Sequence, residues 1–168
     1  NFIVANMKEQ YGAIILAGGQ SSRMGKDKAS LEISGKSMVE RILFKLSPLV
    51  DEVVVIRAPG QTMPSIPEEL KDQIRVGWDS VKGRGPLQGI VDALPLLNSN
   101  IDKVFILTCD LPYITTEWLQ TLKDIMTDEF DLVCTEENKI SNPLLAIYRR
   151  TVLEPASKLL TEGKRRPI

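Results

Sequence analysis

Residues 13–19 read Ala13-Ile14-Ile15-Leu16-Ala17-Gly18-Gly19, a continuous apolar run that stops at two adjacent glycines. A run of this length without polar alternation is typical of a strand that is covered on both faces. Similar runs occur at 53–56 and 104–107, and shorter ones at 132–133 and 144–148. The sequence therefore predicts a buried sheet whose first strand leads directly into a glycine-rich turn.

Amphipathic segments lie between these strands. Residues 37–46, 87–97 and 115–126 have apolar side chains at helical spacing, and Thr115 offers an N-cap for the third segment. Alternation of strands and helices predicts an α/β fold with three layers, in which helices cover both faces of a mostly parallel twisted sheet. The proline-rich stretch 58–67 is expected to be a surface loop.

The composition is that of a globular protein. The 168 residues are 43% hydrophobic and 26% charged, which suits a single globular domain. We expect this domain at 7–168, since Met7 is a plausible start, with 1–6 as an extension or disordered segment. We also expect it to lack its C-terminal end, since the sequence reaches Ile168 without a recognisable closing element. A net charge of −1 gives no overall attraction to nucleic acid, and no apolar run approaches the roughly 18–20 residues of a membrane span. Two cysteines favour a reduced, cytoplasmic setting, and the absence of histidine excludes histidine-based catalysis.

Three turns follow strands of the predicted sheet, and ligands of such sheets bind beyond the carboxyl ends of the strands. These turns comprise residues 18–28, the stretch 79–86 and residues 109–112. In the first turn, two glycines leave backbone N–H groups accessible, and Arg23, Lys26 and Lys28 add positive charge, which predicts a phosphate site. Neither the P-loop spacing nor the G-x-G-x-x-G fingerprint fits, so solvated charges on a glycine-rich turn remain an alternative.

The first motif in full reads Leu16-Ala17-Gly18-Gly19-Gln20-Ser21-Ser22-Arg23-Met24-Gly25-Lys26-Asp27-Lys28. Shorter motifs follow at Gly85-Pro86-Leu87-Gln88-Gly89, Cys109-Asp110-Leu111-Pro112, Asn142-Pro143 and Gly163-Lys164-Arg165-Arg166. In this order, these strings closely resemble the motifs of the MobA-type molybdenum cofactor guanylyltransferases, which are nucleotidyltransferases with a Rossmann-like, GT-A-like fold.

The resemblance implies magnesium-dependent transfer of GMP from GTP to the phosphate of molybdopterin cofactor, with release of pyrophosphate. Its implied partners are GTP, molybdopterin and, transiently, molybdoenzymes or other proteins of cofactor synthesis. The implied nucleotide-binding residues are Leu16, Ala17, Gly18, Gly19, Lys28, Asp79 and Asp110. Arg23, Lys28 and Asp110 are the implied catalytic residues, Asp110 is the Mg²⁺ ligand, and Asn142, Arg165 and Arg166 are acceptor candidates.

Other interpretations of the same residues stay open. Asp110 could be a helix N-cap, Asp79 could hold a ribose hydroxyl or only stabilise a turn, and 163–166 could be a helix C-terminus. The same fold could also serve a cytidylyl or sugar-phosphate nucleotidyltransferase, or a non-catalytic carrier of nucleotide or pterin. Relatives that use CTP resemble Leu-Ala-Ala-Gly in the first motif, so Gly18 favours the purine.

Overall fold

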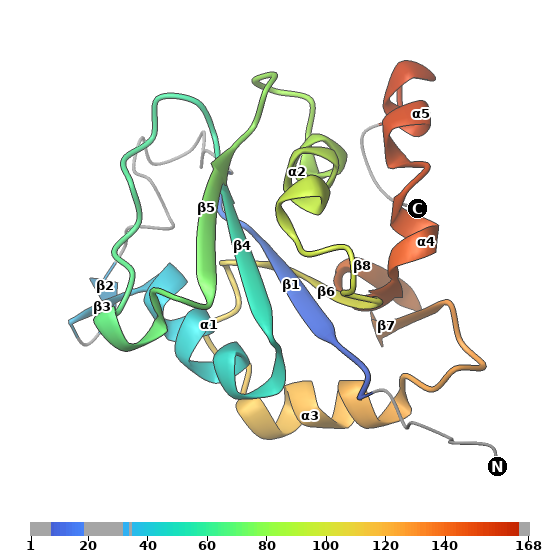
Figure 1. Cartoon of the computed structure of the whole chain (residues 1–168), viewed down its shortest axis with the longest axis horizontal. Coiled ribbons are helices and arrows are strands. Elements are labelled where there is room, and N and C mark those ends of the chain that lie inside the picture. The colour runs from blue at the N-terminus through green and yellow to red at the C-terminus, as the bar shows by residue number, and fades with distance from the viewer. Residues whose placement is uncertain (1–7, 19–31, 34, 165–168) are drawn as a thin grey trace, which may run out of the picture.

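The protein is described from a computed structural model, in which residues 8–18, 32–33 and 35–164 are placed (Figure 1). Its main sheet has six strands, β1 (Tyr11–Leu16), β4 (Glu52–Arg57), β5 (Ile74–Trp78), β6 (Lys103–Thr108), β7 (Leu132–Glu137) and β8 (Ile140–Arg149). Their order is β5-β4-β1-β6-β8-β7. The first four are parallel and the last two pair antiparallel, so the predicted mostly parallel sheet is confirmed.

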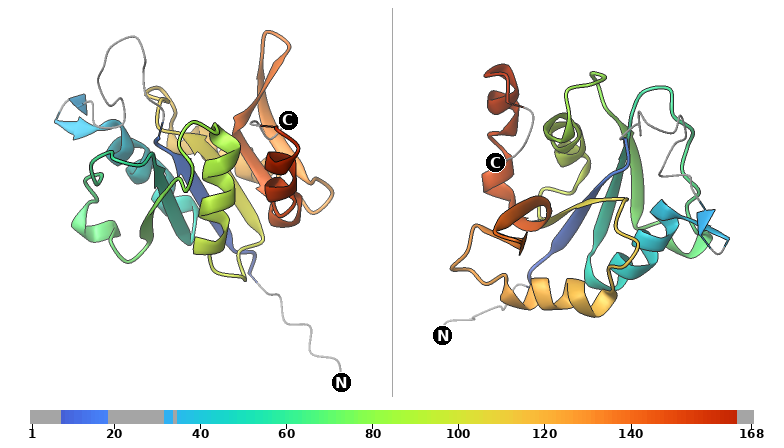
Figure 2. Two further views of the ribbon diagram at one scale, coloured as in Figure 1. Left: turned by 90° about the horizontal axis from the view of Figure 1, so that it is seen from above. Right: turned by 180° about the vertical axis from the view of Figure 1, so that it is seen from behind.

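Helices cover both faces of this sheet (Figures 1 and 2). One face carries α1 (Met38–Leu46) and α3 (Thr116–Ile125), and the other carries α2 (Pro86–Ala93), α4 (Arg150–Leu153) and α5 (Ala156–Thr161). The strands alternate between the two cores, because Ala13 and Ile15 pack toward α1 and α3 whereas Ile14 packs toward α2. The three predicted layers are therefore confirmed.

The helix ends follow from local chemistry. Ser37 and Glu40 form a capping box at the start of α1, and the Thr115 hydroxyl accepts from the amide of Trp118 at the start of α3, as predicted. The helix predicted over 87–97 instead ends at Ala93, because Pro95 lacks an N–H and the chain tightens into a 3-10 turn, Leu94–Leu96. None of the placed helices is long and apolar enough to cross a membrane.

Two regions exceed what the sequence suggested. A small hairpin of β2 (Glu32–Ile33) and β3 (Lys36–Ser37) precedes α1, and β7 and β8 are both longer than the apolar runs at 132–133 and 144–148. The additional residues of β7 and β8 are mostly polar and lie outside the core, so the apolar runs in the sequence did not indicate that the strands extend this far. The stretch 58–67 has no helix or strand, as expected of a loop.

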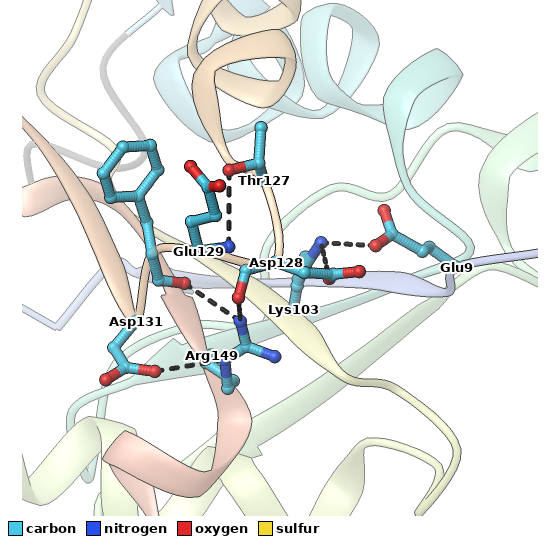
Figure 3. Close-up of polar contacts among 8 residues, drawn as sticks. Glu9, Lys103, Thr127, Asp128, Glu129, Asp131 and Arg149 are labelled. Atoms are coloured by element: carbon cyan, nitrogen blue, oxygen red, sulfur yellow. Dashed lines mark hydrogen bonds and ion pairs between the residues drawn. The ribbon is translucent and has the colours of Figure 1, made fainter.

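The amino edge of the sheet is closed by an ion-pair cluster (Figure 3). Lys103, the first residue of β6, has a side chain only 1% exposed, and its ammonium group pairs with Glu9 and with Asp128, the latter at 3.1 Å. Arg149, its partner in register on β8, donates to Asp131 at 3.2 Å and to the carbonyl oxygen of Asp128 at 2.7 Å. This cluster stabilises the edge opposite to the carboxyl ends of the parallel strands.

Candidate functional site

A cavity of about 530 Å³ lies at the carboxyl edge of the parallel strands. That volume suits a small organic ligand, and the position is where the strand order reverses, between β1 and β6. The cavity is bordered by the ends of β1, β4 and β6, the turn after β5, and the start of α2. Its lining residues are Leu16, Gly18, Ile56, Ala58, Asp79, Lys82, Gly83, Gly85, Pro86, Gly89, Thr108, Cys109 and Asp110.

Backbone hydrogen bonds hold the strand ends of this cavity together. The amide of Ala17 donates to the carbonyl of Ile56 at 2.8 Å, and the amide of Cys109 donates to the carbonyl of Leu16 at 3.4 Å. The turn after β1 is thereby tied to β4 on one side and to the turn after β6 on the other. Gly18 and Asp110, which belong to separate sequence motifs, consequently border one cavity.

Arg57 is a buried cation directly behind the glycine turn. It is 0% exposed, and its guanidinium group donates to the carbonyl oxygen of Ala17 at 2.9 Å and to that of Thr62 at 3.2 Å. Five fixed donors on one planar group let arginine bind several carbonyl oxygens at once. Arg57 therefore fixes the backbone at Ala17, directly before Gly18, and joins it to the loop 58–67.

Asp79 extends into the cavity from the end of β5. Its amide donates to the carbonyl of Arg57 at 2.9 Å, whereas its buried Oδ1 has no hydrogen-bond partner among the placed residues. Burial, and then the negative charge of Asp92, raise the pKa of the Asp79 carboxyl to about 6. A buried acceptor without a partner costs free energy, which makes Asp79 a candidate to bind a ligand that donates hydrogen bonds.

Two glycines make room for this carboxylate. A β-carbon on Gly18 would lie 3.3 Å from Oδ2 of Asp79 and 3.0 Å from the amide nitrogen of Ala58. A β-carbon on Gly89 would lie 3.3 Å from Oδ1 of Asp79 and 2.7 Å from the Leu16 side chain. A side chain at either position would therefore crowd the Asp79 carboxylate and its neighbours, which gives a physical reason for glycine in two of the quoted motifs.

The structure brings together Leu16, Gly18, Asp79 and Asp110, all predicted site residues. Ala17 is buried beneath them, with its backbone held by Ile56 and Arg57. Asn142 lies at the same edge of the sheet but outside the cavity, since β8 passes Leu107 at Leu145, and its side chain accepts from the amide of Leu144. Gly19, Arg23, Lys28, Arg165 and Arg166 lie outside the described residues.

Two of the open interpretations bear on local structure. Asp110 is not an N-cap, because the helix that follows it begins at Thr116. Gly163, with φ of +83°, ends α5 in a Schellman arrangement, in which the amides of Gly163 and Lys164 donate to the carbonyls of Leu160 and Leu159. A second, smaller cavity of about 180 Å³ adjoins that helix end and is lined by Arg84, Leu160, Gly163 and Lys164.

Sequence reasoning missed several residues that shape the site. Arg57 gave no signal, because a cation at the end of an apolar run usually faces solvent, and Lys82 belongs to no quoted motif. Gly89 was quoted only as part of a motif, without its function of making room for Asp79. Within the placed residues, no group of three or more histidine, cysteine or acidic side chains could by itself hold a metal ion.

Comparison with known proteins gives the same assignment. The family model for the MobA-like NTP transferase domain matches residues 13–168. A protein of Bacillus cereus, named "Probable molybdenum cofactor guanylyltransferase", is 35% identical over 160 residues, covering 93% of this chain and 76% of the relative. A protein of the same name from Bacillus mycoides is 35% identical over 156 residues, covering 90% of this chain and 74% of the relative.

Solved structures share the fold. Molybdopterin-guanine dinucleotide biosynthesis protein A from Archaeoglobus fulgidus superposes with a TM-score of 0.67 at 23% identity, covering 92% of this chain and 75% of its own. The 4-diphosphocytidyl-2C-methyl-D-erythritol synthase from Anaerococcus prevotii gives 0.63 at 15% identity, covering 94% and 78%. The shared fold, the site at its strand ends and the match along nearly the whole chain lead to one conclusion: the chain belongs to the MobA-like NTP transferase family of nucleotidyltransferases.

Proposed function

We propose that this nucleotidyltransferase transfers GMP from GTP to the terminal phosphate of molybdopterin, forming a guanine dinucleotide and releasing pyrophosphate. The observation that carries the proposal is the placement of Asp79 and Asp110 in one cavity beside Gly18. The names of the Bacillus relatives support guanine as the base and the molybdenum cofactor as the acceptor.

Asp79 is the residue proposed to recognise the guanine base by hydrogen bonds. A carboxylate accepts two parallel hydrogen bonds, and guanine presents two adjacent donors, N1–H and the 2-amino group. Cytosine and adenine each place a ring acceptor next to their amino group, which an ionised carboxylate would repel. The buried Oδ1, which has no partner among the placed residues, supports this pairing, because a bound guanine would satisfy it.

Asp110 is the proposed ligand of a magnesium ion. Mg²⁺ usually takes one or two carboxylates from the protein and completes its shell with water and substrate phosphates. One exposed carboxylate at the edge of a cavity open to phosphates fits that donor set. When bound, the ion would neutralise negative charge on the triphosphate and its leaving group.

The chain's own residues would then act by alignment and charge. An oxygen of the acceptor phosphate attacks the α-phosphorus of GTP, a new phosphorus–oxygen bond forms, and the bond to the β-phosphate oxygen breaks as pyrophosphate leaves. A phosphate monoester is already anionic near neutral pH, so no general base is required, consistent with a chain without histidine. Arg23 and Lys28 are proposed to hold the triphosphate, and Asn142, Arg165 and Arg166 the acceptor.

Nucleotide preference tests the proposal most directly. We expect calorimetric titration in the presence of Mg²⁺ to show tighter binding of GTP than of CTP, UTP or ATP. In a separate turnover assay, we expect pyrophosphate release only when molybdopterin is also present. A preference for CTP, or equal affinities, would instead assign a different nucleotidyltransferase. Binding of GTP without turnover in the presence of molybdopterin would indicate a carrier rather than an enzyme.

A further inference from the structure

A partly buried hydrogen-bond network holds the residue that follows Asp79. Ser80 donates to the carboxylate of Asp92 twice, from its backbone amide at 2.7 Å and from its hydroxyl at 3.0 Å. Gln88 donates from its side-chain amide to the same carboxylate at 3.1 Å and to the Ser80 hydroxyl at 3.0 Å. Gln88 is 5% exposed, so part of this network is shielded from water.

Helix α2 presents these contacts one turn apart. Residues four apart lie on the same face of a helix, so Gln88 and Asp92 bind Ser80 together. Between them, Gly89 lies against the Asp79 carboxylate, where a β-carbon would be 3.3 Å from Oδ1. The same helix therefore fixes Ser80 by hydrogen bonds and defines the space in which the side chain of its neighbour lies.

We propose that Asp92 is a positioning residue for base recognition, which holds Ser80 through this network and thereby fixes the direction of the Asp79 carboxylate in the cavity. The inference rests on the proposed function of Asp79 as the reader of guanine. Asp92 does not line the cavity, so it acts only through Ser80, Gln88 and its charge.

The charge of Asp92 adds a second, separable effect. Besides Asp92 on α2, the charged side chains around Asp79 among the described residues are Lys82 in the same turn, Asp110 after β6 and Arg57 at the end of β4. Asp92 contributes to the raised pKa of Asp79, after burial. Removing its charge alone should lower that pKa, whereas removing its hydrogen bonds should disturb the direction of the carboxylate.

Two variants separate these effects. In Asp92→Asn the amide oxygen can still accept from the Ser80 amide and from Gln88, and the amide nitrogen can donate to the Ser80 hydroxyl. The same contacts are therefore kept, with the one to the hydroxyl reversed in direction, while the charge is lost. In Asp92→Ala all of these contacts are lost. Asp124→Asn is the matched control, because Gln120 donates to Asp124 at 2.7 Å across one turn of α3, outside the cavity.

The measured quantity is the affinity for GTP relative to inosine triphosphate, which lacks the 2-amino group that Asp79 would bind. We expect Asp92→Ala to reduce the GTP preference about tenfold, equivalent to about 1.4 kcal/mol, because a misdirected carboxylate would lose part of its hydrogen bond to the 2-amino group. Asp92→Asn should keep the preference but move the pH midpoint of GTP binding to lower pH. Asp124→Asn should change neither.

The inference is overturned if Asp92→Asn, which should fold, leaves the pH midpoint unchanged and Asp92→Ala keeps the wild-type preference. If Asp92→Ala does not fold, Ser80→Ala replaces it, because that variant removes only the two hydroxyl contacts and should lower the preference by a smaller factor. A wild-type protein without any GTP preference would refute the proposed function instead, so the two failures are distinguishable.

Discussion

Gly18 and Asp79 approach each other so closely that a β-carbon at residue 18 would lie 3.3 Å from the Asp79 carboxylate. Gly18 follows β1 and Asp79 follows the edge strand β5, so the turns after these two strands come into contact in the cavity. Crowding at this point would act on the proposed base site and on the backbone of Ala58, 3.0 Å away, simultaneously.

Gly18→Ala should therefore weaken GTP binding and destabilise the fold. Overpacking of this kind costs about 1–3 kcal/mol, measurable by urea unfolding. Gly60→Ala is the control, because its β-carbon would meet nothing within 4 Å while its φ of +81° still imposes backbone strain. The control should lose stability without losing GTP affinity, and equal affinity losses in both variants would contradict the crowding argument.

Asp79→Asn should weaken GTP binding and raise the free energy of unfolding. The carboxyl has a pKa of about 6 in the folded protein, above its ordinary value, so stability falls as pH rises from about 4 to 6. Replacing it with asparagine removes that cost; with solvent screening at this half-buried site, the gain is on the order of 1–2 kcal/mol above pH 6 and vanishes near pH 4. Unfolding curves at several pH values test this, and equal stabilities at pH 8 would contradict it.

GTP binding should also weaken below neutral pH. The proposed pairing needs an ionised Asp79, so affinity should fall as the pH drops through about 6, the pKa of that carboxyl. Below this value the loss approaches ~tenfold per pH unit for one coupled proton. The triphosphate itself titrates in this range, so the pH dependence that remains in Asp79→Asn gives the baseline.

Asp110→Ala and Lys28→Ala should abolish turnover with little change in melting temperature, because the proposed roles lie in charge and metal binding rather than in packing. Arg23→Ala should raise the KM for GTP, because Arg23 is proposed to hold the triphosphate, and an unchanged KM would contradict that role. Magnesium titration of the Asp110→Ala protein should show no recovery of activity within the range that saturates the wild type. A large fall in melting temperature would assign the residue a structural role instead.

The ion pairs at the amino edge give a prediction of the opposite kind. The double variant Glu9→Gln with Asp128→Asn leaves the buried Lys103 without these two counter-charges. The melting temperature of this variant should therefore be lower than that of the wild-type protein. Nucleotide affinity should stay at the wild-type value, because this cluster lies at the amino ends of β1 and β6, whereas the cavity lies at their carboxyl ends. A change in GTP affinity would show coupling between the two edges.

The strands at the centre of the fold were predictable, because Ile14, Val54 and Ile106 lie in unbroken apolar runs that only a doubly covered sheet accommodates. Placing Gly18 and Asp110 at one edge followed from parallel strands. The contacts of Arg57, Ser80 and Asp92 were not predictable. Polar residues at ordinary helix and turn positions have no pattern that distinguishes a buried network from a solvated surface.

The geometry of α2 limits where residues can be inserted into or deleted from this chain. Gln88, Gly89 and Asp92 must keep their angular relationship, since each residue of a helix turns the chain by about 100°. A single inserted residue between Gly89 and Asp92 would turn the carboxylate away from Ser80, whereas extra residues in the exposed turn 98–100 would only lengthen the connection to β6. Insertions and deletions during divergence should therefore be tolerated in that turn and excluded within the helix.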